Sequence, residues 1–207
     1  MEFIDIHTHN KESNNLSSIL NSNEYIAGRR ISIGIHPWDI SGDWKELFAT
    51  IRMNAYKENV CAIGECGIDK LKPPAGEELQ QEVFKAHALL AEEAKKPLII
   101  HCVKGFDTII SLRKEISPKQ AWIIHGFRGK PQQAEQLIKN GFYISYGEKF
   151  NSESLKNTPK ERLFIESDES EKSIEEIYNG IAEIKGCSTA ELSVTIMHNA
   201  VKCNIFL

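Results

Sequence analysis

Apolar residues gather in short runs along the chain, and several of these runs end in a side chain that can bind a metal ion. We predict strands at seven of them, residues 3–9, 31–36, 60–66, 97–102, 121–126, 142–146 and 162–168. Their nearly continuous apolar character is typical of parallel strands that are buried on both faces. An eighth strand would have to lie in the polar stretch 10–29, where residues 16–20 offer a short apolar run.

Segments with helical periodicity separate most of these runs. We expect helices at residues 43–56, 77–95, 106–114, 131–139, 174–184 and 189–205. Repeated strand–helix units favour a closed barrel over an open sheet. We therefore predict the α/β class, with residues 1–207 forming a single domain, a trimmed (β/α)8 TIM barrel with a reduced second strand. The 207 residues are fewer than the roughly 250 that are usual for such barrels.

Composition and charge restrict the classes of partner. Hydrophobic residues make up 41% of the chain and charged residues 26%, and the net charge of −4 gives no general attraction to nucleic acid or membrane. A bound divalent cation would add local positive charge that this count omits, so a nucleic-acid substrate stays open. The five cysteines show no C-x-x-C spacing, and no leader or membrane-spanning stretch is evident, so we expect a reducing cytoplasm.

Six candidate metal ligands stand at the ends of the apolar runs: His7, His9, Glu65, His101, His125 and Asp168. Chemistry in parallel barrels gathers at the carboxyl ends of the strands, where these side chains would converge. His7 and His9 are two residues apart and so point to the same side of a strand. Glu65 can bridge two cations because a carboxylate offers two oxygens. A chance arrangement is disfavoured because burying such groups unpaired is costly.

Other polar and aromatic residues have two interpretations each. Asp5 is a candidate for orienting a histidine. His36 either lines the mouth of the site or is an ordinary loop residue, whereas a packing role is favoured for His87 over a place at the rim. The tryptophans are expected to pack, with a place beside the pocket as the alternative for Trp38. Apart from its candidate ligand, the acidic run 166–171 is expected to be a solvated loop and helix start.

In their order, these segments resemble the TatD family of metal-dependent hydrolases, which belongs to the amidohydrolase-like barrels. No single motif decides the matter, but the series is specific and covers nearly the whole chain. The matching pieces include residues 3–9, 34–37, 62–69, 81–91, 97–101, 125–129, 165–168 and the closing segment up to Phe206.

The resemblance implies a centre with one or two divalent metal ions. In it, His7 and His9 would hold the first ion and Glu65 would bridge. His101 and His125 would serve the second ion. The family is associated with Mg²⁺- or Mn²⁺-dependent DNA hydrolysis, and structures of relatives often carry zinc. The ligand types leave these three metals open, because imidazole suits zinc and carboxylate suits magnesium or manganese.

The resemblance also gives Asp168 two tasks, as a ligand of the first ion and as the general base for the attacking water; with Glu65 it completes the pair of candidate catalytic residues. The chain departs from the family at Val103, where an arginine is usual, and at residues 169–170, where a small residue and a proline are usual. Lys104 and Arg128 are then the nearest candidates for binding a substrate phosphate.

The function expected from the sequence is that of a metal-dependent phosphodiesterase, with DNA or another phosphodiester as substrate. A metal lowers the pKa of bound water, and two ions can stabilise the attacking and leaving oxygens of a phosphodiester. No membrane and no obligate protein partner is evident. Two alternatives stay open because a fold does not fix a substrate. They are a hydrolase of another ester or amide, and a metal-binding relic without activity.

Overall fold

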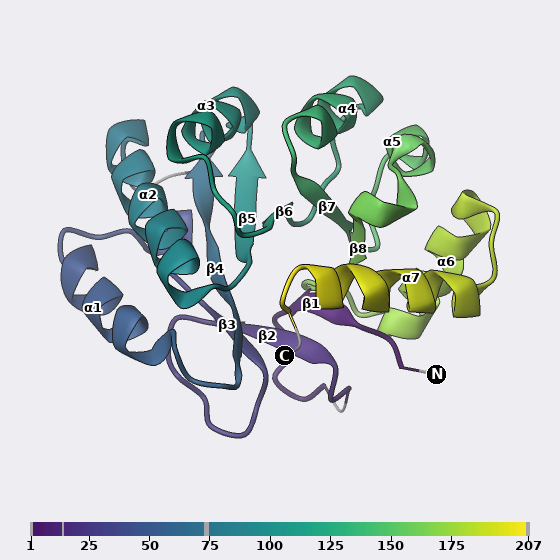
Figure 1. Ribbon diagram of the computed structural model, residues 1–207, viewed down its shortest axis with the longest axis horizontal. Coiled ribbons are helices and arrows are strands. Elements are labelled where there is room, and N and C mark those ends of the chain that lie inside the picture. Colours follow the sequence, from purple (N-terminus) through teal and green to yellow (C-terminus); the bar gives the residue numbers. More distant parts are fainter. Residues whose placement is uncertain (1, 14, 73–74, 206–207) are drawn as a thin grey trace.

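Eight parallel strands, paired in chain order, build the barrel (Figure 1). The computed structural model describes residues 2–13, 15–72 and 75–205. The strands are β1 (Asp5–Thr8), β2 (Ser18–Ser22), β3 (Ile31–Ile33), β4 (Val60–Asp69), β5 (Leu98–Val103), β6 (Trp122–Ile124), β7 (Tyr143–Tyr146) and β8 (Leu163–Ile165). A parallel bridge between Thr8 and Asp168 joins the two ends of the sheet. The predicted (β/α)8 barrel is therefore confirmed.

Helices cover the outside of the barrel from β3 onward. They are α1 (Trp44–Asn54), α2 (Glu77–Ala94), α3 (Phe106–Ile116), α4 (Pro131–Lys139), α5 (Ser152–Asn157), α6 (Ile174–Lys185) and α7 (Thr189–Lys202), with 3₁₀ turns η1 (Pro37–Asp39) and η2 (Lys160–Arg162). All six expected helices are present, although the last one ends at Lys202. Phe206, part of the family-like closing segment, lies outside the described residues. The short helix α5 is an addition to the expected set.

The barrel is trimmed at its first strands. Within the described residues, no helix joins β1 to β2 or β2 to β3, and Figure 1 shows loops in place of helices there. The second strand itself is not reduced: β2 has five residues, whereas β3 has three. Its polar side chains bond to other strands: Ser18 Oγ donates to Asp5 Oδ2 of β1 at 3.2 Å, and Asn21 Nδ2 donates to Glu65 Oε2 of β4 at 3.2 Å. The weak apolar pattern of this segment is therefore a consequence of its hydrogen bonding.

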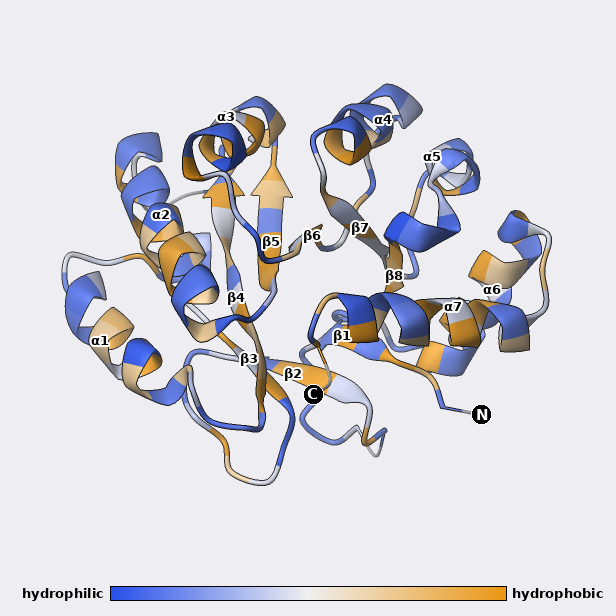
Figure 2. Ribbon diagram, viewed as in Figure 1, coloured by the Kyte–Doolittle hydropathy of each residue, from blue (hydrophilic) through white to orange (hydrophobic). Residues whose placement is uncertain are grey.

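The interior is apolar and continuous around the barrel, as the colouring of the strands and inner helix faces in Figure 2 shows. Aromatic rings fill the space between helices and strands, and Trp122 packs edge-on against Phe84 with centroids 5.1 Å apart. The five cysteines are free thiols, as expected. Among the described residues, no helix combines the length and apolar character needed to cross a membrane.

A glycine brings two of the chemistry-bearing strands together. Gly67 of β4 pairs with His101 of β5, and a Cβ atom at Gly67 would overlap the carbonyl oxygen of His101. Only glycine fits such a close approach of two backbones. Because of it, His101 and Glu65 emerge side by side at the carboxyl ends of their strands.

Candidate metal centre

Glu65 occupies the middle of a cluster of imidazoles at the carboxyl ends of the strands. Its Oε1 atom lies 2.6 Å from His125 Nε2, 3.0 Å from His101 Nδ1 and 3.4 Å from His36 Nε2. The side chain is only 3% exposed, so these contacts take place away from bulk water. One carboxylate oxygen therefore faces three histidines from three different strands.

The second oxygen of Glu65 faces the first strand. Its Oε2 atom lies 3.4 Å from His7 Nε2 and 3.7 Å from His9 Nε2. Asp168 Oδ1 approaches the same two nitrogens, at 3.9 Å and 3.8 Å. Asn21 holds the backbone of Glu65, because its Oδ1 accepts the N–H of Glu65 at 2.9 Å. The two oxygens of Glu65 thus point to two separate groups of ligand atoms.

The charges within the cluster depend on one another. Burial opposes ionisation of Glu65, but the nearby His125 and His7 hold the pKa of this carboxyl well below its usual value. Burial likewise opposes a charge on His125, but Glu65 and Glu166 raise its pKa well above the usual value. Contact with Glu65 also raises the pKa of His9. The buried acids and imidazoles stabilise each other as ions.

The donor set fits divalent metal ions. Ligand atoms within 4.8 Å of one another form three overlapping groups, which are His7–His9–Glu65, His7–His125–Asp168 and His36–Glu65–His101. His7 is fully buried, yet neither of its ring nitrogens has a hydrogen-bond partner among the described residues. A buried polar group without a partner is costly, and a metal ion bound to this ring would offset that cost. Imidazole and carboxylate together suit zinc, manganese or magnesium.

All six candidate ligands expected from the sequence meet in this cluster, and the structure adds His36 as a further candidate. His36 follows β3, so its place after an apolar run was the signal for it. The backbone just before His36 is bonded to His87: Ile35 donates its N–H to Nε2 of the buried His87 at 3.1 Å. A role for His87 inside the protein, favoured from the sequence, agrees with this contact.

Two carboxylates hold the histidines around Glu65 Oε1. Glu166 Oε1 lies 3.3 Å from His125 Nδ1 and accepts the Gly126 N–H at 2.6 Å. Asp69 Oδ2 lies 3.2 Å from His101 Nε2. In each ring, one nitrogen faces its carboxylate and the other faces Glu65. Such contacts fix the tautomer and the orientation of a ligand imidazole.

The position of Glu166 differs from the one expected from the sequence. It belongs to the acidic run that was expected to be solvated, but it is completely buried. Its pKa is held low: burial opposes ionisation, and the nearby His125 outweighs that effect. The side chain turns inward at the end of β8, whereas Glu169 and Glu171 of the same run are not buried. A run of acids near a strand end therefore contains both a solvated part and a buried one.

Asp5 does not orient a histidine, in contrast to the role suggested by the sequence. Its oxygens accept the backbone N–H of Ser167 at 2.9 Å, the hydroxyl of Ser167 at 2.7 Å and that of Ser18 at 3.2 Å. Burial raises the pKa of Asp5 to about 7, with these hydrogen bonds opposing the rise. Asp5 thus fixes the turn that presents Asp168.

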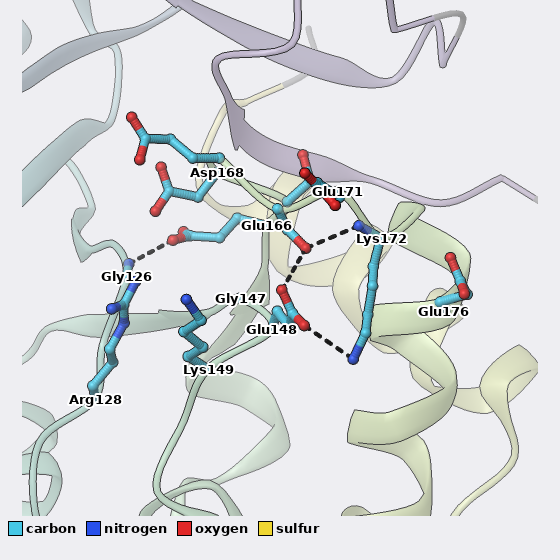
Figure 3. Close-up of a pocket in the computed structure, with 13 residues that line it drawn as sticks. Gly126, Arg128, Gly147, Glu148, Lys149, Glu166, Asp168, Glu171, Lys172 and Glu176 are labelled. Atoms are coloured by element: carbon cyan, nitrogen blue, oxygen red, sulfur yellow. Dashed lines mark hydrogen bonds and ion pairs between the residues drawn. The ribbon is translucent and has the colours of Figure 1, made fainter.

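An open cleft of about 710 Å³ leads to the centre. Lys104 and Arg128, the two expected phosphate-binding residues, both line it, together with Trp38, Phe106 and Glu169. A second cavity of about 580 Å³ adjoins the cleft and shares Arg128, Asp168 and Glu169 with it. Figure 3 shows Asp168 and Glu166 on one side of this cavity and Glu148, paired with Lys172 at 3.1 Å, on the other. Charged side chains of both signs therefore line the approach to the centre.

Comparisons with known proteins agree with this geometry. A family model described as TatD related DNase matches residues 2–204. Over 145 residues the chain is 33% identical to the uncharacterized metal-dependent hydrolase YabD of Bacillus subtilis, covering 66% of this chain and 57% of the relative. Over 146 residues it is 32% identical to the 3'-5' ssDNA/RNA exonuclease TatD of Erwinia tasmaniensis, covering 65% and 56%. The chain spans little more than half the length of these curated relatives.

Solved structures show the same fold. The crystal structure of YjjV, a TatD homolog from Escherichia coli, superposes with a TM-score of 0.81 at 18% identity, covering 98% of this chain and 97% of that chain. A TatD family hydrolase from Entamoeba histolytica gives 0.75 at 17% identity, with 98% of both chains covered. At these identities the likeness concerns the barrel alone.

Proposed function

The chain belongs to the family of TatD related DNases, and from this premise we propose that it is a divalent-metal-dependent hydrolase of phosphodiester bonds, with DNA as the favoured substrate. The observation that carries the proposal is Glu65, whose two carboxylate oxygens face two different groups of histidines. A carboxylate placed between two groups of nitrogen ligands is suited to bridging a pair of divalent ions. The exonuclease name of one relative supports nucleic acid as the substrate class.

We assign the ligands as two groups around Glu65. His7 and His9, together with Asp168, would hold one ion, and His101 and His125 the other. When bound, such ions lower the pKa of a coordinated water and offset negative charge on the oxygens of a phosphodiester. His36, 3.4 Å from Glu65 Oε1, adds a donor beside the second group.

Asp168 is the proposed general base. Its side chain is 24% exposed at the edge of the cleft and stands next to His7 and His9, so it can reach a water molecule there. In the reaction Asp168 would take a proton from this water as its oxygen bonds to phosphorus. The ester P–O bond then breaks, and the leaving oxygen takes up a proton. Lys104 and Arg128 would hold non-bridging phosphate oxygens from the cleft wall.

Hydrolysis of a different ester or of an amide is the second candidate function. Two features favour it: Val103 replaces the usual arginine, and Glu169 adds negative charge to the cleft. Both would weaken binding of a long polyanion.

The deciding experiment compares substrates under defined metal loading. Chelator-stripped protein is supplied with Mg²⁺, Mn²⁺ or Zn²⁺ and offered a labelled single-stranded oligonucleotide, an aryl carboxylic ester and an aryl amide. Cleavage of the oligonucleotide with at least one metal, and none with chelator, is expected. Ester or amide turnover without oligonucleotide cleavage would replace the proposal with the second candidate. Metal binding without any turnover would identify a relic.

A further inference from the structure

Trp38 stands out among the three tryptophans of the chain. Trp44 and Trp122 are packed in the interior, at 7% and 0% exposure, but Trp38 is 49% exposed. It lines the same cleft as Glu65 and His101. An exposed aromatic side chain that lines the cleft of a candidate site is typical of a ligand pocket.

The indole is held firmly although it is exposed. Its Nε1–H donates to Asp69 Oδ2 at 2.8 Å, and Asp69 in turn accepts the backbone N–H groups of Leu71 and Lys72 through Oδ1, at 2.7 Å and 3.1 Å. The backbone N–H of Trp38 donates to His36 Nδ1 at 3.1 Å. With its single polar atom already bonded, the ring has only apolar aromatic surface to offer to a ligand.

The ring lies next to the metal centre. Its centroid is 4.9 Å from that of His36 and 6.1 Å from that of His101, in edge-on arrangements. A phosphodiester held near Glu65 would therefore have the indole within the length of one nucleotide. The ammonium group of Lys72 lies over the face of the ring, with Nζ 5.7 Å from the ring centroid.

We propose that Trp38 is a stacking subsite for the nucleobase next to the scissile phosphodiester, an inference that rests on the proposed function. A nucleotide presents what this part of the cleft can bind, a planar aromatic ring and an anionic phosphate. Stacking of a base on an aromatic side chain tolerates any base, because every base has a π face. It strengthens binding by roughly 5- to 100-fold. The subsite would thus select nucleotide esters over simple alkyl phosphodiesters.

Binding measured without turnover tests the subsite. Thymidine 5'-monophosphate and deoxyribose 5-phosphate, which lacks the base, are titrated by calorimetry and by tryptophan fluorescence, with and without Mg²⁺. We expect the nucleotide alone to quench the emission of the exposed Trp38. W38L should weaken nucleotide binding by roughly 5- to 100-fold and leave the sugar phosphate unaffected.

Two further variants separate the effect of lost stacking on nucleotide affinity from the effect of a disturbed structure. W38F keeps an aromatic face but loses the bond to Asp69, and it should restore most of the nucleotide affinity. Y56L removes another exposed aromatic residue, 56% exposed and not part of the cleft lining, and should bind as the wild type does. Equal affinity of the wild type for both phosphates, or an equal loss of both in W38L, would overturn the subsite. Trp38-dependent nucleotide binding without oligonucleotide cleavage would instead overturn the proposed hydrolysis and leave the subsite standing.

Discussion

Glu166 and His125 form a buried pair in which Oε1 of the carboxylate lies 3.3 Å from Nδ1 of the ring, while Nε2 of the same ring lies 2.6 Å from Glu65. The pair joins the end of β8 to the end of β6 and sets which nitrogen of His125 faces the centre. Asp69 has the corresponding position for His101 on the other side, 3.2 Å from its Nε2. The centre is therefore built of ligands and of the acids that orient them.

Replacing Glu166 by glutamine should weaken metal binding without unfolding the protein. The amide keeps the size of the side chain but removes the charge that orients His125. Loss of such a partner typically lowers metal affinity 10- to 100-fold. Titration with Co²⁺, followed by visible absorption, measures this. E148Q, a matched change in the adjoining cavity, should bind Co²⁺ as the wild type does, and equal affinity in E166Q would contradict the orienting role.

Glu65 should matter more for metal content than any single histidine. Two of the three groups of ligand atoms meet at its carboxylate, whereas His9 and His101 each belong to one group. We expect E65Q to lose more bound Mn²⁺ per chain, by elemental analysis after dialysis, than either H9A or H101A. A loss in E65Q no larger than in the histidine variants would show that the carboxylate is not shared.

Gly67 should tolerate no side chain. In G67A the new methyl group would overlap the carbonyl oxygen of His101, so β4 and β5 must separate. Overpacking of this kind costs about 1–3 kcal/mol of unfolding free energy. G180A in α6 is the matched control: its methyl group meets nothing within 4 Å, and it should stabilise the helix by about 0.5–1 kcal/mol. Thermal unfolding compares them, and equal melting temperatures would refute the close approach.

His87 should make stability depend on pH. Burial lowers its pKa from 6.5 to about 4, so between these values the unfolded chain binds a proton that the folded chain does not. Stability from this residue is present above pH 6.5 and is lost as the pH falls towards 4, by up to about 3 kcal/mol. Urea unfolding from pH 7 to 4 should show a shallower decline in H87Q than in the wild type. The exposed-histidine variant H198Q should keep the wild-type slope, and parallel curves for H87Q would contradict the buried neutral state.

The strands and the cluster of six candidate ligands were predictable because hydrophobic runs and the residues that terminate them are local features. The orienting acids were not. Glu166 sits in an acidic run that resembles any solvated loop, and only closure of the barrel buries it against His125. Asn21 was not predicted for a different reason: the polar residues of β2 that bond to β1 and β4 interrupt the apolar pattern of this strand. Helix α5 carries one buried leucine, Leu155, too few apolar positions to show a period.

The central claim is that Asp168 acts as base at a metal centre that cleaves phosphodiesters. It is tested most directly by measuring, in one set of samples, metal content and single-turnover cleavage of a single-stranded oligonucleotide by the wild type, D168N and D43N. Asp43 is exposed and lies outside the lining of the cleft, so D43N should match the wild type. Asparagine keeps one oxygen that can bind a metal ion but cannot act as a base, so D168N should retain bound metal and cleave about 10²- to 10⁴-fold more slowly. Cleavage by metal-loaded D168N at the wild-type rate would contradict the claim.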